Sequence, residues 1–239
     1  MLRLRGVRFA YDGASPVLDG VDLDLGPGLT LLLGPNGCGK STLMKLVAGV
    51  EKPDMGAVSV EGRDMWAEEV AARAALAYVP EQPDLTPYAT LSEVMRLVCR
   101  LRGETTVRAS EALTRVGLGS MGSRSIREMS MGQRRRAVLA AAMIGSPRHF
   151  LLDEPLEAMD RGMRDDVLAW IAAHRAAGAL ILVVTHEIEP FVALADHALT
   201  LHDSRAVLLD TLPIDQAARV SLLESLARGG APHAARPVT

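Results

Sequence analysis

The 239-residue sequence has few aromatic residues, only two cysteines and no long uncharged apolar segment. Aromatic residues make up 3% of the chain and hydrophobic residues 49%, so aliphatic and alanine side chains must fill the core. Cys38 and Cys99 lack CxxC or ligand-like spacing, which argues against a disulfide scaffold or a cysteine metal site and favours a reducing compartment. No apolar run reaches the roughly 18 residues that a spanning helix needs, and no signal peptide is expected. Any membrane role would therefore depend on a partner.

The sequence also lacks a strong charge excess and a low-complexity linker. Its 26 lysines and arginines against 29 aspartates and glutamates give a net charge of −3, which offers no bulk attraction to a polyanion. We therefore expect no nucleic-acid partner. No Gly/Ser- or Pro-rich linker and no internal repeat divides the chain, so one domain with an insertion is expected.

The hydrophobic pattern predicts alternating strands and helices with a helical insertion. Residues 2–11 and 21–25 alternate apolar and polar side chains, as in antiparallel strands with one solvated face. Residues 92–116 instead carry apolar side chains at helical spacing, which predicts an inserted helical subdomain. The tail from 229 to 239 is expected to be too small and polar to pack. Further strands are expected at 29–33, 56–65 (strand and turn), 74–79, 149–153, 179–185 and 205–210, and further helices at 40–50, from 132, from 162 and at 214–228.

A phosphate-binding loop is the first chemical motif. Residues 34–41 read GPNGCGKS, which matches GxxxxGK[ST] between an apolar strand and a helix. Glycines let backbone N–H groups surround phosphate oxygens, and the helix N-terminus adds positive potential. Lys40 supplies a cation for the β- and γ-phosphates, and the Ser41 hydroxyl can complete a Mg²⁺ shell. A chance glycine loop is the alternative, and the strand-to-helix context disfavours it.

Two adjacent carboxylates form the second motif. Asp153 and Glu154 end the mostly apolar strand HFLLD. Since parallel strands present their carboxyl ends to ligands, Asp153 can hold Mg²⁺ and Glu154 can accept a hydrogen bond from the attacking water. An ordinary acidic strand exit is the alternative, which the phosphate loop upstream makes less favourable.

Five further features complete a family resemblance. They are Tyr11 before an Asp-Gly turn, Gln82 in YVPEQP, the segment Ser130-Met131-Gly132-Gln133, the segment Glu157-Ala158-Met159-Asp160, and His186 in VTHE. In their order and spacing they resemble the adenine-stacking aromatic, Q-loop, signature motif, D-loop and switch histidine of ATP-binding-cassette (ABC) ATPases. The resemblance covers nearly the whole chain.

The elements and the resemblance together predict an α/β fold. We expect a P-loop NTPase core, with a mixed sheet flanked by helices, an antiparallel β-subdomain and an inserted helical subdomain. Residues 1–82 and 147–212 would form the RecA-like core with its N-terminal β-subdomain. Residues 83–146 would form the helical subdomain with the signature motif, and 213–239 a C-terminal helix and flexible tail.

Site roles follow from the motifs and the resemblance. Glu154, His186 and Gln82 are the expected catalytic residues, and Ser41, Gln82 and Asp153 the expected metal contacts. The expected nucleotide contacts are Tyr11, Asn36, Gly37, Cys38, Gly39, Lys40, Ser41, Thr42, Ser130, Gly132, Gln133 and Asp160.

Several of these residues also have a structural interpretation. Tyr11 is alternatively a half-buried strand tyrosine, Gln82 an ordinary loop residue, and His186, taken alone, more often structural than functional. Arg134 to Arg136 are expected to meet solvent or carboxylates of the fold rather than nucleic acid.

The signature segment departs from the usual LSGGQ, because Met129 and Met131 replace leucine and the first glycine. Ser130 and Gly132 remain at a helix N-terminus, where they can meet a phosphate. We expect Met131 to be harmless if its side chain points outward, and costly only if its φ must be positive.

The resemblance implies ATP and Mg²⁺ as ligands and a second cassette as partner, in a homodimer or a paralogous heterodimer. It also implies a transmembrane permease subunit, so that the chain would lie in the cytoplasm against the inner face of the cell membrane. The segment from Pro80 to Gly103 is similar to ATPase subunits of bacterial two-component export systems, which favours export. The alternative is a non-transport ABC ATPase in cell-envelope signalling, metal-cluster assembly or DNA metabolism.

Overall fold

The structure is a computed structural model that describes residues 1–83 and 85–230. Its centre is a six-stranded sheet in the order β10-β9-β3-β8-β7-β6, in which β9, β3, β8, β7 and β6 pair in parallel and β10 pairs antiparallel to β9. The expected mixed sheet is therefore confirmed. Its strands are β3 (Gly28–Leu33), β6 (Leu76–Val79), β7 (His149–Asp153), β8 (Leu180–Val184), β9 (His197–His202) and β10 (Arg205–Leu209).

A second sheet of four antiparallel strands, in the order β2-β1-β4-β5, forms the expected β-subdomain. Buried and exposed residues largely alternate along β1, so one face of this sheet packs inward and the other meets solvent. Its strands are β1 (Leu2–Phe9), β2 (Leu18–Leu25), β4 (Met55–Val60) and β5 (Arg63–Asp64).

The core lies on both faces of the six-stranded sheet. Leu31 and Leu33 of β3 belong to one buried cluster, which extends to the helices of the insertion, whereas Leu32 belongs to another. Helix α1 (Lys40–Val47) fills that second cluster, where its buried side chains meet both sheets. Burial on both faces explains why β3, β7 and β8 are mostly apolar rather than alternating.

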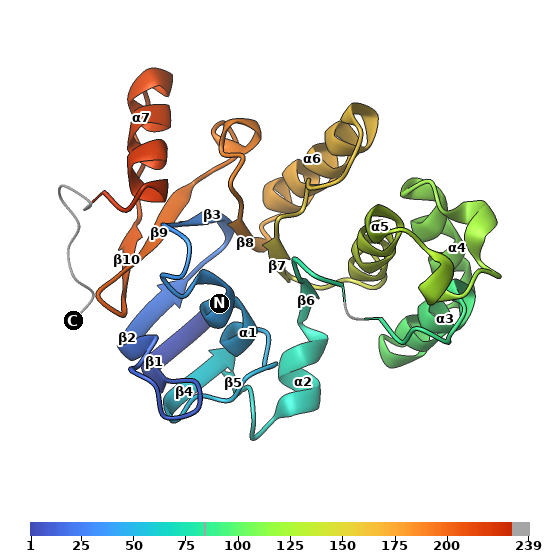
Figure 1. The fold of residues 1–239 in the computed structure, drawn as a ribbon, viewed down its shortest axis with the longest axis horizontal. Helices are drawn as coiled ribbons and strands as arrows, with labels where there is room; N and C mark the ends of the chain where they lie inside the picture. Colours follow the sequence, from blue (N-terminus) through green and yellow to red (C-terminus); the bar gives the residue numbers. More distant parts are fainter. Residues whose placement is uncertain (84, 231–239) are drawn as a thin grey trace.

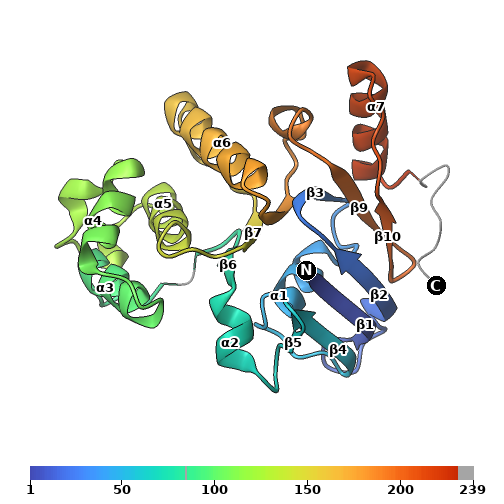
Figure 2. The ribbon, with the colours of Figure 1, turned by 180° about the vertical axis from the view of Figure 1, so that it is seen from behind.

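The inserted helices form a group beyond the β6 edge of the sheet, on the side away from β10 (Figures 1 and 2). They are α3 (Leu91–Leu101), α4 (Thr106–Arg115) and α5 (Met131–Ala142), with short 3₁₀ segments η1 (Gly119–Met121) and η2 (Ile126–Glu128). The helical insertion predicted from the 92–116 pattern is present, and α5 joins it to β7.

The remaining helices are α2 (Glu69–Ala74), α6 (Arg161–Ala176), η3 (Glu189–Phe191) and α7 (Gln216–Ala227). Neither α2 nor β9 was expected from the sequence. Helix α2 is too short for a periodic pattern, and β9 is a strand because β3 and β10 pair with its two edges. The predicted helix over 40–50 ends at Val47, and the predicted strand over 2–11 ends at Phe9. The predicted tail lies outside the described residues from 231 onward.

Within residues 1–83 and 85–230, no helix combines the length and the apolar character that crossing a membrane requires.

Candidate functional site

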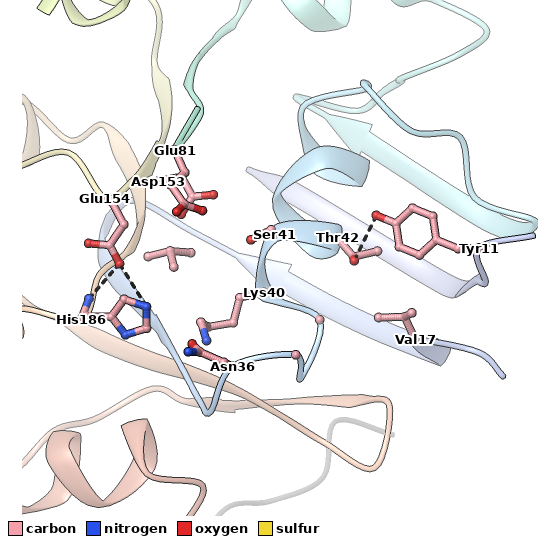
Figure 3. Close-up of a pocket in the computed structure, with 13 residues that line it drawn as sticks. Tyr11, Val17, Asn36, Lys40, Ser41, Thr42, Glu81, Asp153, Glu154 and His186 are labelled. Carbon is pink, nitrogen blue, oxygen red and sulfur yellow. Dashed lines mark hydrogen bonds and ion pairs between the residues drawn. The ribbon is translucent and has the colours of Figure 1, made fainter. Parts of the chain in front are cut away.

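A cavity of about 510 Å³ opens at the carboxyl ends of the parallel strands, next to the N-terminus of α1 (Figure 3). The loop after β3, the end of β7 and the segment after β8 all reach it, so three strands deliver side chains to one place. Most of the residues expected from the phosphate-loop and acidic motifs meet here. The cavity is lined by Tyr11, Val17, Asn36, Gly37, Gly39, Lys40, Ser41, Thr42, Glu81, Asp153, Glu154, Val184 and His186.

The loop between β3 and α1 needs glycine for its shape. Gly39 is the N-cap of α1 with φ +108°, and a Cβ there would lie 2.9 Å from a Val17 methyl carbon. Among the described residues, no side chain caps this helix end, and Gly39, Lys40 and Ser41 line the cavity, so an anion there can accept hydrogen bonds from the first N–H groups of the helix. Lys40 Nζ donates to the carbonyl oxygens of Gly34 (2.7 Å) and Pro35 (3.0 Å). The Lys40 side chain therefore bends back toward its own loop, and its ammonium group stays within reach of the cavity.

Asp153 ends β7 with 4% of its surface exposed. Burial is the main cause that raises its pKa, to about 6, and the neighbouring carboxylates of Glu81 and Glu154 raise it further, against the opposing charges of Lys40 and Arg135. Glu81 and Asp153 both line the cavity, and their side chains overlap in the view of Figure 3. Two carboxylates in this setting favour binding of a cation.

Glu154 follows with a strained backbone, since its φ of +48° is uncommon for a residue other than glycine. The turn aims its carboxylate at the segment after β8, where it accepts hydrogen bonds from the backbone N–H of His186 (2.9 Å) and from Thr185 Oγ1 (3.3 Å). The His186 ring lies beside it, with Nε2 at 3.7 Å from Glu154 Oε1 (Figure 3). Burial raises the pKa of Glu154 above its ordinary value, while His186 opposes the rise. An uncommonly basic carboxylate thus faces the cavity.

Tyr11 lies on the opposite side of the cavity from the carboxylates (Figure 3). Its ring packs edge to face on Phe9, with centroids 4.9 Å apart, and its hydroxyl lies 3.3 Å from Thr42 Oγ1. Tyr11 is 40% exposed. It lies beyond the last residue of β1 and presents an aromatic surface at the cavity.

Gln82 is absent from the cavity lining as the described residues form it, whereas its neighbour Glu81 belongs to that lining; both residues are exposed. Glu81 was missed because adjacent loop residues look equivalent in the sequence. Its place only two residues after the end of β6 was the one available signal.

Ser130, Gln133 and Asp160 lie at helix starts, outside the lining of this cavity as the described residues form it. Ser130 and Gln133 form a reciprocal capping box at the start of α5, and Asp160 caps α6 by accepting the Met163 N–H at 3.0 Å. Gly132 lies in the first turn of α5. Met131 is 57% exposed and opens that helix with a φ outside the positive range, so its side chain points outward as expected.

The residues at the cavity suit Mg²⁺ rather than a metal held wholly by protein. Ser41 and Asp153 supply hard oxygen atoms there. In the described part of the chain, no group of three or more His, Cys, Asp or Glu side chains is arranged to hold a metal ion. Mg²⁺ is normally held by one or two carboxylates together with substrate phosphates and water, so this donor set fits it.

A second, more apolar cavity of about 470 Å³ lies between α2, β6, α3 and α5; we call it the α3–α5 groove. Tyr88, within the segment 80–103, is exposed and does not line this groove. The groove is lined by Val70, Arg73, Ala74, Ala77, Tyr78, Val98, Leu101, Arg102, Val138, Ala141 and Ala142.

Comparison with protein families identifies residues 18–157 with a family described as "ABC transporter". The Fe(3+) ions import ATP-binding protein FbpC 2 of Rhodococcus jostii is 35% identical over 217 residues, which are 88% of this chain and 62% of that protein. The aliphatic sulfonates import ATP-binding protein SsuB 2 of Xanthomonas axonopodis pv. citri is 36% identical over 215 residues, or 89% and 72% of the two chains. This chain thus spans less than two thirds of the first relative.

Solved structures share the fold. One described as the ATP-binding subunit of an ABC transporter has a TM-score of 0.78 at 27% identity and covers 86% of this chain and 87% of its own. A dimeric structure of the cassette MJ0796, bound to ADP and Pi in a post-hydrolysis state, has a TM-score of 0.77 at 24% identity, with 90% and 100% coverage.

Proposed function

The chain belongs to the ABC transporter family, and we propose that it is an ATP-binding cassette subunit in which Mg-ATP hydrolysis in a dimer of cassettes energises a separate transmembrane permease. The observation that carries the proposal is the cavity at the carboxyl ends of β3, β7 and β8. It brings Lys40, Asp153, Glu154 and His186 together although they lie up to 146 positions apart in sequence.

Nucleotide binding is assigned to the phosphate loop and Tyr11. The N–H groups at the start of α1 bind phosphate oxygens, and Lys40 leaves its two loop carbonyls to neutralise phosphate charge. The exposed Tyr11 ring stacks on adenine. The remaining loop contacts are Asn36, Gly37, Cys38, Gly39, Ser41 and Thr42.

Catalysis is assigned to the carboxylate end of the cavity. Mg²⁺, when bound, supplies charge neutralisation of the phosphates, and Ser41 and Asp153 would hold it. Glu154 accepts the hydrogen bond of the attacking water, for which its raised pKa and its fixed orientation by Thr185 and His186 suit it. The His186 ring donates to the γ-phosphate. Because Glu81 rather than Gln82 lies in the cavity, we assign to Glu81 the contact with the metal's water shell that the sequence suggested for Gln82.

A second cassette completes each site. Ser130, Gly132 and Gln133 lie at the start of α5 and Asp160 at the start of α6, away from this chain's own cavity, so we propose that they meet the nucleotide of the partner chain. A helix N-terminus with a serine cap is a suitable contact for a γ-phosphate. The MJ0796 cassette, which has the same fold, is described as a dimer.

The permease is proposed to dock in the α3–α5 groove, which would hold this chain at the inner face of the cell membrane. Leu101 is 76% exposed at the groove, and Val98 and Tyr78 line it. An apolar segment of the permease would cover this surface. Co-expression with the cognate permease should bring the chain into the membrane fraction, and Leu101→Asp should release it. Val107→Asp, at an α4 position that is 61% exposed and outside the groove lining, is the matched control.

The relatives bear on the direction of transport. Those with a stated direction are named import proteins for Fe³⁺, aliphatic sulfonates, sn-glycerol-3-phosphate or sulfate/thiosulfate. The expectation of export from residues 80–103 gains no support from them, so we propose energised transport with import as the direction to test first. Their names also give no support to the non-transport alternative.

Glu154→Gln tests the proposal. The amide keeps the size and the acceptor for the His186 N–H but removes the base. Hydrolysis should fall by roughly 10²-fold or more, while ATP remains bound and holds two chains together as a dimer in light scattering. Glu189→Gln, at an exposed position outside the cavity lining, should behave as wild type. Hydrolysis at the wild-type rate would remove Glu154 from the mechanism. An inactive variant that stays monomeric in ATP would require a different, paralogous cassette as partner.

A further inference from the structure

Three consecutive arginines, Arg134 to Arg136, follow the first three residues of α5, and they have different surroundings. Arg135 is 8% exposed, whereas Arg134 and Arg136 are only partly buried. Arg134 donates to the carbonyl oxygens of Ile126 (3.1 Å) and Arg127 (3.2 Å), and Arg136 donates to that of Val116 (3.3 Å). These two therefore bind groups of the helical insertion itself.

Arg135 instead leaves the insertion and binds the ATPase core. Its Nε and Nη2 donate to the carbonyl oxygen of Glu81, at 3.0 and 2.5 Å, and its Nη1 forms an ion pair with the carboxylate of Glu157. Glu81 follows β6 and lines the nucleotide cavity. Glu157 follows β7, and its N–H donates to the carbonyl oxygen of Glu154 at 3.2 Å. One guanidinium thus joins both segments that deliver carboxylates to the cavity.

The start of α5 contacts the second segment at another point. A Cβ on Gly132 would lie 3.2 Å from the carbonyl oxygen of Ala158, so the helix packs almost directly on this backbone. Ala158 has a φ of +58°, an uncommon conformation that fixes the chain's direction there. The helix start and residues 157–158 are therefore held together twice, once by packing and once by the ion pair of Arg135.

A guanidinium is suited to this junction for a specific reason. Its donors have a fixed planar arrangement, so two of them can hold one carbonyl oxygen while a third binds a carboxylate. A lysine at the same position carries its three N–H donors on one nitrogen and cannot keep both contacts in that geometry. Losing the side chain would also leave the Glu81 carbonyl without these two bonds.

We propose that Arg135 is a positioning residue for ATP hydrolysis: it holds Glu81 in the cavity and links the start of α5 to residues 157–158. This rests on the proposed function, in which the start of α5 contacts the nucleotide of the partner cassette. In the proposed function, Arg135 therefore couples closure on the partner's nucleotide to the arrangement of the chain's own carboxylates. The phosphate loop makes no contact with Arg135 in the hydrogen bonds and ion pairs of the described residues, so we expect the affinity of a single chain for nucleotide to change little when Arg135 is replaced.

The test compares wild type with Arg135→Gln, Arg135→Lys and Arg134→Gln. For each, the Mg-ATP hydrolysis rate at saturation, the Kd of a fluorescent ATP analogue and the thermal unfolding midpoint are measured. Arg135→Gln should lower kcat at least tenfold with Kd within threefold, and Arg135→Lys should lie between it and wild type. Arg134→Gln removes the same charge one position away and should keep kcat within twofold.

Each result decides the proposal. A folded Arg135→Gln protein with kcat within twofold of wild type overturns it, and so does an equal loss in Arg134→Gln, which would indicate a general charge effect. If Arg135→Gln does not fold, the test uses Glu157→Gln, which keeps the bonds of Arg135 to Glu81. This variant should lower kcat severalfold at unchanged Kd. An unchanged kcat would overturn the link to residues 157–158. A wild type without Mg-ATP hydrolysis in the same assay would instead refute the proposed function.

Discussion

Asp153→Asn should make the nucleotide-free protein more stable at neutral pH while abolishing its activity. Burial, assisted by Glu81 and Glu154, raises the pKa of Asp153 from 3.8 to about 6 in the folded chain. A folded-state pKa above the unfolded value means that the folded protein holds this proton more tightly, so stability falls as pH rises from about 4 to about 6 and stays lower above it. At about 1.4 kcal/mol per pH unit, the loss amounts to about 3 kcal/mol.

The asparagine variant cannot ionise, so it should escape this loss. Its free energy of unfolding should exceed that of wild type by up to about 3 kcal/mol at pH 7.5 and by close to zero at pH 4. Urea denaturation at both pH values, with EDTA and without nucleotide, measures the difference. Asp166→Asn, at an exposed position of α6, should change stability by less than about 0.5 kcal/mol at either pH.

Mg-ATP should reverse the order of stability. In wild type, binding of the metal relieves the unfavourable free energy of the buried, charged Asp153. The variant should therefore gain less stability from Mg-ATP, and it should hydrolyse Mg-ATP at least 10²-fold more slowly. A variant that is less stable than wild type at pH 7.5, or a stability difference that does not change with pH, would refute the idea that Asp153 is a strained, cation-seeking carboxylate.

Three other substitutions probe separate parts of the chain. Lys40→Ala removes the cation of the phosphate loop and should abolish turnover or weaken ATP binding at least tenfold in a fluorescence titration; unchanged turnover at saturating ATP would argue against the site. Met131→Gly should leave the ATPase rate within a few-fold because the side chain is exposed, and a hundredfold gain, about 2.7 kcal/mol in barrier, would contradict this. Asp196 accepts hydrogen bonds from the Leu29 N–H (2.9 Å) and Arg175 Nε (2.7 Å), which lower its pKa despite partial burial. Asp196→Asn should therefore cost about 1.5–3 kcal/mol at pH 7, a difference that shrinks as pH falls below 3.8, where wild type also loses its charge.

Local motifs were predictable because their functional residues are contiguous in the sequence. Residues 34–42 carry the loop, the helix start, the lysine and the hydroxyls in one run, so the spacing alone indicates a phosphate site. Asp153 and Glu154 were found for a similar reason, since they end an apolar strand. Because β3, β7 and β8 are buried on both faces, they are mostly apolar and easy to recognise in the sequence.

Features that depend on neighbours distant in sequence were not predictable in this way. The strand β9 is set by its pairing with β3 and β10. Arg135 has the same neighbours in sequence as an ordinary solvated arginine, and becomes buried only where β6 and β7 deliver Glu81 and Glu157 to its guanidinium.

The sequence by itself determined the family resemblance, the phosphate loop and the carboxylates at the end of β7, because each rests on short motifs of adjacent residues and, for the resemblance, on their order along the chain. The tertiary structure decided which of Glu81 and Gln82 faces the nucleotide cavity. In an irregular loop, the side chains of two adjacent residues point in different directions, and the sequence pattern does not show which one faces the cavity. Here the direction follows from where β6 ends and from the two hydrogen bonds that hold the Glu81 carbonyl to Arg135, 54 positions later in the chain.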